Sequence, residues 1–81
     1  TGFYLRFILE DTPGSLANIA TVLGNNGVSI ESVIQRDIDE RGASIILVTH
    51  ETKELNVMDA LKELENLKVV KEIASVIRVE R

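Results

Sequence analysis

The sequence predicts an α+β fold whose elements follow the order strand, helix, strand, strand, helix, strand. Three observations favour this class. Four segments carry apolar patterns typical of strands, and two segments between them repeat apolar residues at helical spacing. Residues that favour turns separate the segments. With 81 residues, of which 44% are hydrophobic and 27% charged, the chain has the size and composition of a single globular domain over residues 1–81.

The first strand is predicted over residues 3–10, where the side chains alternate in character. One face is wholly apolar, and we expect it to be buried: Phe3, Leu5, Phe7 and Leu9. Residues 11–14 then break the run. Pro13 suits the first turn of a helix, because its missing N–H would have no partner there. We expect Asp11 or Thr12 to be the N-cap.

The first helix follows this break. Its apolar residues have the spacing of a single buried stripe, formed by Leu16, Ile19, Ala20 and Leu23. Asn25-Asn26-Gly27 ends the helix, because Asn and Gly tolerate the left-handed conformation of a helix C-terminus. A second strand is predicted over residues 28–37. Its apolar pattern changes phase along the strand, which predicts a bulge near Ser32.

The polar segment 39–42 predicts a hairpin connection to a third strand over residues 43–50, whose apolar run 45–48 favours a central position. Thr52 or Asn56 is expected to cap the second helix, which Asn66 ends and whose buried stripe is Val57, Leu61 and Leu64. The last strand covers residues 69–79. This order is the ferredoxin-like βαββαβ sandwich, with an antiparallel sheet of order 4-1-3-2 and both helices on one face.

Charge and residue types exclude several functions. The net charge is -4 with acids and bases interspersed, so the surface repels a phosphate backbone and nucleic acid is not an expected partner. The absence of cysteine removes disulfides and thiolate metal sites, and it fits a cytoplasmic protein. No apolar run is long enough for a membrane anchor. The single histidine, His50, has no second ligand at metal-binding spacing, so we expect it to be a strand-end polar residue.

The residues that other proteins with the βαββαβ plan need for their activities are missing from this sequence. RNA-recognition modules need exposed aromatic residues on the central strands, and the predicted third strand has none. The loop after the first strand carries Asp11, whose negative charge disfavours an anion such as the phosphate that acylphosphatases bind. No Gly-rich phosphate motif precedes a helix. A nucleophile, a base and an orienting group cannot be assembled from these residues, so we expect no catalysis by this chain.

The loop over residues 11–16 is the candidate site. It leads into a helix N-terminus, where the N–H groups from Gly14 through Leu16 can hold a carboxylate, and the Asp11 side chain can hold an ammonium group. These two features complement a zwitterionic amino acid. Gly14 would let the ligand approach the backbone. The alternative is structural: Asp11 and Thr12 only cap the helix, and Gly14 only relieves packing.

The motif order resembles a known family. The strand Tyr4-Leu5-Arg6-Phe7 is followed by Asp11-Thr12-Pro13-Gly14-Ser15-Leu16-Ala17, which resembles the opening of ACT domains, whose signature is a strand, D-x-P-G-x-L and a helix. Segments 27–35, 48–51 and 69–79 extend the resemblance over nearly the whole chain. They look most like the C-terminal domain of bacterial homoserine dehydrogenases. Ser15 departs from the common pattern, in which a Val often follows the Gly, and adds a hydroxyl to the loop.

This resemblance implies a regulatory role in a longer enzyme. The amino-acid effector would be threonine or a relative, sensed for feedback control of aspartate-family amino-acid biosynthesis. The domain itself would hold no cofactor, while NAD(P) would bind elsewhere in the parent. The chain starts at Thr1, without Met and close to the first strand, so we expect it to be the C-terminal piece of a protein whose nicotinamide-binding and catalytic domains lie upstream.

The resemblance also implies an assembly and a ligand shell. ACT domains commonly associate side by side, so we expect a homodimer with the ligand between the first loop of one subunit and the second strand of its neighbour. By motif position, the loop group is Asp11, Pro13, Gly14, Ser15 and Leu16. The second group is Asn25, Asn26, Val28, Ile30 and Ser32. The second group has a structural alternative, in which Val28 and Ile30 are core residues and Asn25-Asn26 is a helix cap.

A second hypothesis makes this an interaction domain. It would hold enzyme subunits together through an unpaired edge strand and helix contacts, with a ligand pocket that no longer functions.

Overall fold

Four strands and two helices follow one another in the predicted order. The computed structural model describes residues 1–80, except for the side chains of Asp37 and Asp39. The elements are β1 (Gly2–Leu9), α1 (Ser15–Asn25), β2 (Ile30–Asp39), β3 (Gly42–Thr49), α2 (Glu54–Leu64) and β4 (Val70–Val79). Every strand boundary lies within two residues of the predicted one. Within residues 1–80, neither helix has the length and apolar character that crossing a membrane requires.

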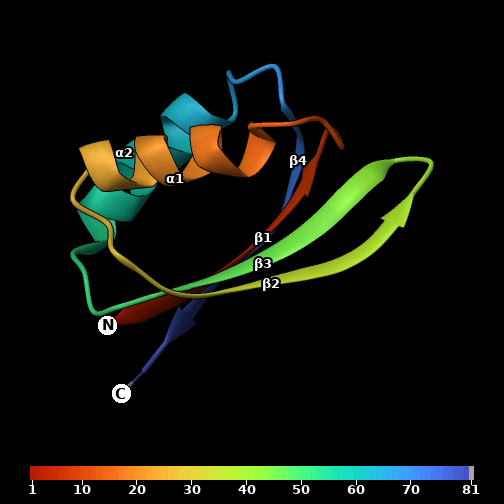
Figure 1. Cartoon of the computed structure of the whole chain (residues 1–81). Helices are drawn as coiled ribbons and strands as arrows, with labels where there is room; N and C mark the ends of the chain where they lie inside the picture. The colour runs from red at the N-terminus through yellow and green to blue at the C-terminus, as the bar shows by residue number, and fades with distance from the viewer. Residues whose placement is uncertain (81) are drawn as a thin grey trace.

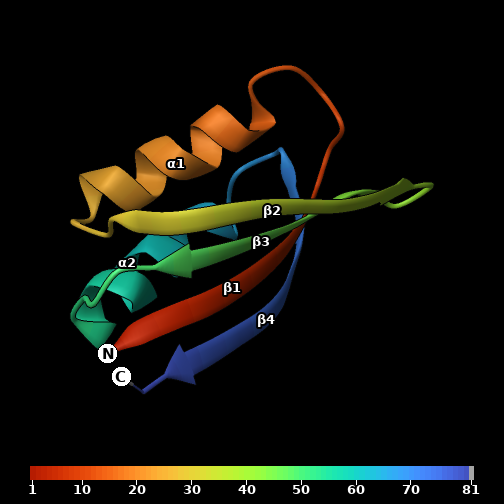
Figure 2. The same ribbon diagram turned by 60° about the horizontal axis from the view of Figure 1, so that its bottom comes forward.

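The strands form one antiparallel sheet with the order β2-β3-β1-β4, which is the predicted order 4-1-3-2 counted from the other edge. Figure 2 shows this order across the sheet, with β1 and β3 in the middle. Both helices lie against the same face of the sheet, and the opposite face carries no helix (Figure 1). The predicted ferredoxin-like plan is therefore confirmed.

The core fills the space between the sheet and the helices. The face of β1 that alternation predicts to be apolar is buried, and Leu5 and Phe7 are fully enclosed. Leu47 of β3, Ile19 of α1 and Leu64 of α2 pack into the same cluster. Full burial of one such side chain is worth about 1.5–3 kcal/mol relative to an exposed one. This packing fixes which side of each strand faces the helices.

The N-caps differ from the prediction. The N-cap of α1 is Gly14, at a left-handed φ of 85°, and the N-cap of α2 is Lys53; neither has a side-chain cap hydrogen bond. Pro13 and Gly14 form a turn between Thr12 and the helix, so Thr12 and Asp11 stand too early to cap, and Pro13 lies outside the first helical turn. Thr52 precedes the cap of α2, and Asn56 lies inside that helix.

The buried stripe of α1 is rotated from the predicted one. Ser15 is 5% exposed and faces the core with Ile19 and Leu23, whereas Leu16 is 38% exposed. Ser15 is the first helical residue and lies one turn before Ile19, so the stripe runs through positions 15, 19 and 23. Leu16 is one position further along and lies outside this stripe, at the edge of the core. The prediction of Leu16 as a core residue is therefore wrong.

The Asn-Asn-Gly segment ends α1 as predicted, and the helix end is a Schellman motif. Gly27 has a left-handed φ of 75°. Its N–H donates to the Gly24 carbonyl at 3.0 Å, and the Val28 N–H donates to the Leu23 carbonyl at 2.9 Å. The Asn26 side-chain amide adds bonds to the Val22 carbonyl at 2.8 Å and to Glu63 Oε1 at 3.2 Å. The second of these ties the end of α1 to α2.

The bulge predicted near Ser32 is confirmed. Ile30 pairs with Thr49 and Ser32 pairs with Val48, so Glu31 is an additional residue in β2. As a result Ile30 packs against the core, while Ser32 shares the opposite face of the sheet with Val48. A second irregularity separates Gln35 from Ile38.

The β2–β3 hairpin depends on a glycine. Gly42 begins β3 with φ at 126°, and a Cβ on it would lie 2.1 Å from the Leu9 carbonyl oxygen. Side chains are excluded from this position both by the backbone conformation and by the approach of β1.

Candidate functional site

The loop after β1 forms one wall of a small hollow between α1 and the sheet. Its volume is about 70 Å³. The opposite wall comes from β2 and β3, at the point where Leu9 pairs with Ala43. The lining residues are Leu9, Glu10, Asp11, Thr12, Ser15, Leu16, Gln35, Ala43 and Ile45. Of the predicted loop group, Asp11, Ser15 and Leu16 therefore share one hollow.

A short hydrogen-bond network holds the loop. The hydroxyls of Thr12 and Ser15 lie 2.8 Å apart and share a hydrogen bond. The Ser15 N–H donates to the Thr12 carbonyl at 3.2 Å. This N–H is therefore not available to a ligand, contrary to the prediction from the sequence. Within residues 1–80, no such hydrogen bond engages the N–H groups of Gly14 and Leu16. The turn thus presents two donors without a hydrogen bond at a helix N-terminus.

Asp11 and Gly14 differ in their relation to the hollow. The Asp11 side chain is exposed and lines the hollow, next to the half-buried Glu10. Gly14 and Pro13 do not line it, although a Cβ on Gly14 would have no heavy atom within 4 Å. Its φ of 85° is one that other residues rarely adopt, so a glycine is favoured at this position.

The second predicted group lies at the far end of α1. The helix has eleven residues, which separates its ends by about 16 Å at 1.5 Å per residue. Val28 is 2% exposed and belongs to the core, and Asn26 is the helix C-cap, so the structural alternative describes both. Ile30 packs against the core, whereas Asn25 and Ser32 are exposed. A single chain does not bring this group to the loop.

Sequence reasoning missed the far wall of the hollow. Gln35, Ala43 and Ile45 come from strands that are distant from the loop in sequence. The signal that locates them is the pairing register, in which Leu9 meets Ala43 and Gln35 meets Ile45. That register follows from the hairpin turn and the bulge in β2, which local patterns define only approximately.

Within the described residues, no group of three or more His, Asp or Glu side chains could hold a metal ion. His50 follows β3 and is exposed. Its N–H donates to the Ser29 carbonyl at 2.9 Å, so the backbone of His50 joins the chain before β2 to the end of β3.

Known proteins match this chain along its length. The family model of the ACT domain matches residues 3–69. Homoserine dehydrogenase of Synechocystis sp. is 44% identical over 79 residues, which cover 98% of this chain and 18% of that protein. Homoserine dehydrogenase of Bacillus subtilis is 39% identical over 79 residues, covering 95% of this chain and 18% of that protein.

A solved structure agrees with the fold. The crystal structure of a homoserine dehydrogenase from Thiobacillus denitrificans superposes with a TM-score of 0.86 at 36% identity, covering 99% of this chain and 17% of that one. The chain thus spans about a fifth of the length of the relatives that it matches. Because the family model covers most of the chain, and because the element order and sheet order agree with the family's fold, the chain belongs to the ACT domain family.

Proposed function

We propose that this chain is the amino-acid-binding regulatory domain of an NAD(P)-dependent homoserine dehydrogenase, and that threonine or a related amino acid is its effector. The domain would pass the concentration of the pathway's end product to upstream catalytic domains, as feedback control in the cytoplasm. The observation that supports this is the hollow behind the β1–α1 loop, where the Asp11 carboxylate and the helix N-terminus lie close in sequence and share one wall.

The loop offers complementary groups to a zwitterion. Asp11 can pair with the ammonium group of an amino acid, and the N–H groups of Gly14 and Leu16 at the helix start can hold its carboxylate. The Thr12 and Ser15 hydroxyls lie beside these groups and can bond a side-chain hydroxyl. These contacts favour a small polar side chain such as that of threonine.

The size of the hollow supports a dimer. Ligand pockets have volumes of about 300–1,000 Å³, so a hollow of about 70 Å³ is too small to enclose an amino acid by itself. A second copy has to supply the missing wall. The edge strand β2 is available for this, because it exposes the apolar side chains of Val33, Ile34 and Ile38. Side-by-side pairing would carry Ser32 of β2 toward the neighbour's loop.

The test is ligand-dependent stabilisation of the chain, measured together with its mass by light scattering. Threonine, isoleucine, serine, methionine and lysine are compared. At one hundred times its dissociation constant, a ligand of the folded form adds about 2.7 kcal/mol of stability. For a domain of this size, that raises the melting temperature by about 10–20 °C.

The Asp11→Asn variant tests the proposed ammonium contact. It keeps the shape of an exposed side chain, so we expect an unchanged melting temperature without ligand and at least tenfold weaker threonine binding. Asp59→Asn on the exposed side of α2 is the control, because it removes the same charge away from the hollow. Equal weakening in both variants, or full affinity in Asp11→Asn, would contradict the assignment. Gly14 is unsuitable for this test, because its positive φ makes any side chain there destabilising.

A second candidate function is assembly alone. The apolar side chains exposed on both edge strands, which include Val33 and Ile34 of β2 and Val76 and Ile77 of β4, favour association with or without a ligand. A stable dimer that none of the amino acids stabilises would support this function, whereas a monomer that binds threonine would exclude it.

A further inference from the structure

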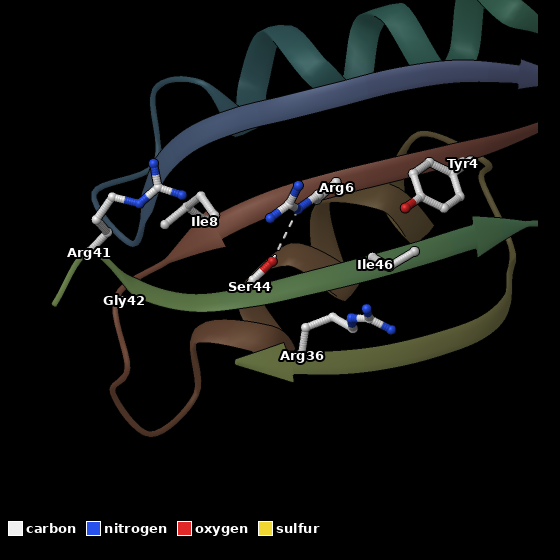
Figure 3. Close-up of a pocket in the computed structure, with 8 residues that line it drawn as sticks. All are labelled: Tyr4, Arg6, Ile8, Arg36, Arg41, Gly42, Ser44 and Ile46. Carbon is white, nitrogen blue, oxygen red and sulfur yellow. Dashed lines mark hydrogen bonds between the residues drawn. The ribbon is translucent and has the colours of Figure 1, made fainter. Parts of the chain in front are cut away.

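The larger hollow of the molecule lies on the face of the sheet that the helices leave open. Its volume is about 210 Å³, three times that of the hollow behind the β1–α1 loop. Figure 3 shows its side chains rising from β1, β2 and β3 and from the turn before β3. We call it the arginine pocket, because its lining includes Arg6, Arg36 and Arg41.

The charge of the arginine pocket is opposite to that of the whole chain. Three of the nine basic residues line it, in a chain whose net charge is -4. No acidic side chain is among its lining residues in the described part of the chain. Glu72 shares this face in register, opposite Ile8, but it lies on β4, on the far side of β1 from β3. Arg6 and Arg36 carry like charges on two sides of this hollow, which favours an anion between them.

Arg6 is held in place by the strand beside it. Its Nε donates to the hydroxyl of Ser44 on β3 at 3.1 Å, as the dashed line in Figure 3 marks. A guanidinium carries five N–H donors, so this bond leaves four on the terminal nitrogens. Arg6 is half-buried, and the fixed Nε orients its flat terminal group over the sheet. This is the geometry with which arginine binds the paired oxygens of a carboxylate or phosphate.

Arg36 approaches the same space from the other side of β3. β1 and β2 flank β3, so their backbones are about 10 Å apart, with Ser44 and Ile46 of β3 between them. Arg6 of β1 and Arg36 of β2 therefore stand on opposite sides of one hollow. Apart from Ser44, the rest of the lining is apolar or aromatic, with Ile46 and Tyr4 at one end. A ligand with anionic oxygens and a short carbon skeleton matches this arrangement.

We propose that the arginine pocket binds a small organic anion with a phosphate or two carboxylates. A drug-sized or nucleotide-sized ligand needs about 300 Å³ or more, which exceeds this hollow. The proposal does not depend on the amino-acid site, because side chains alternate along β3: Ala43 and Ile45 face the loop hollow, while Ser44 and Ile46 face the arginine pocket.

The test is titration of the chain with inorganic phosphate, sulfate and succinate at constant ionic strength, followed by NMR of the Ser44 and Ile46 amides. Constant ionic strength removes the general screening of surface charge. We expect saturable shifts of these amides with a dissociation constant below about 1 mM, the affinity of a weak specific site. Whichever of phosphate and succinate has the lower dissociation constant identifies the class of anion.

Matched variants distinguish anion binding in the arginine pocket from a general effect of surface charge. Arg36→Gln removes one exposed charge and is expected to weaken anion binding at least tenfold; Arg6→Gln should do the same. Arg78→Gln is the control, because Arg78 lies on β4 outside the pocket and pairs with Glu54 of α2. We expect less than a twofold effect from it. The proposal is wrong if no anion gives saturable shifts with a dissociation constant below about 1 mM, or if Arg78→Gln weakens binding as much as Arg36→Gln.

Discussion

The buried hydroxyl of Thr49 offers a quantitative test of how the sheet is held together. Thr49 is fully buried at the end of β3. Its Oγ1 accepts the N–H of Phe3 at 3.0 Å and donates to the His50 carbonyl at 2.8 Å. In Thr49→Val the shape is kept and the hydroxyl is lost, so the buried N–H of Phe3 is left without this acceptor. A buried donor without a partner costs about 1–3 kcal/mol.

The expected loss is set mainly by Phe3. The His50 carbonyl belongs to an exposed residue and can turn to water, so the buried N–H contributes most of the cost. We expect Thr49→Val to lower the free energy of unfolding by about 2 kcal/mol, which lowers the melting temperature of a domain of this size by about 8–16 °C. Thr49→Ser keeps the hydroxyl and loses one buried methyl, for a cost of about 1 kcal/mol.

The assay is urea unfolding of the three proteins, followed by circular dichroism. The denaturant slope should be the same in all three, because the area exposed on unfolding hardly changes. The expected order of stability is wild type, then Thr49→Ser, then Thr49→Val. A Thr49→Val variant as stable as the wild type, or more stable than Thr49→Ser, would refute the role assigned to this hydroxyl.

Two further predictions concern glycine and asparagine. Gly42→Ala should lower stability by about 1–3 kcal/mol, because its Cβ would meet the Leu9 carbonyl oxygen, whereas Gly24→Ala inside α1 should raise it by about 0.5–1 kcal/mol, because nothing lies within 4 Å. Thermal unfolding of both variants tests this, and shifts of the same sign would contradict it. Asn26→Ala should cost about 1 kcal/mol through its two lost bonds, and Glu63→Ala less, since it removes one; equal losses would contradict this.

The sequence predicts the parts of the fold that local patterns determine. Alternation in residues 3–10 defines the buried face of β1, and the Asn-Asn-Gly segment defines the end of α1. The errors occur where a short connection determines at which residue a helix begins, and therefore which of its side chains face the core. The Pro13-Gly14 turn delays the start of α1, so the expected caps are too early and Ser15 replaces Leu16 in the buried stripe. Helix propensity alone cannot show which residue of a turn becomes the N-cap.

The candidate site is predictable only in its local half. The motif from Asp11 to Leu16 indicates the loop, and four of its residues line the hollow: Asp11, Thr12, Ser15 and Leu16. The far wall and the whole arginine pocket come from residues on separate strands. In the sequence, Arg6 is only an outward-facing residue of a strand and Arg36 lies thirty positions away. They become neighbours through strand pairing, which depends on the register of the entire sheet.

The additional residue in β2 determines which of the two hollows each later side chain of that strand faces. Side chains of a strand alternate between faces, so the insertion of Glu31 exchanges the two faces for the residues that follow. With it, Gln35 points toward the β1–α1 loop and Arg36 toward the open side of the sheet. A strand that kept Ile30 in the core but lacked the bulge would place the positive charge beside Asp11 and the amide in the other hollow. One residue therefore keeps the cation of β2 away from the carboxylate that is proposed to bind an ammonium group.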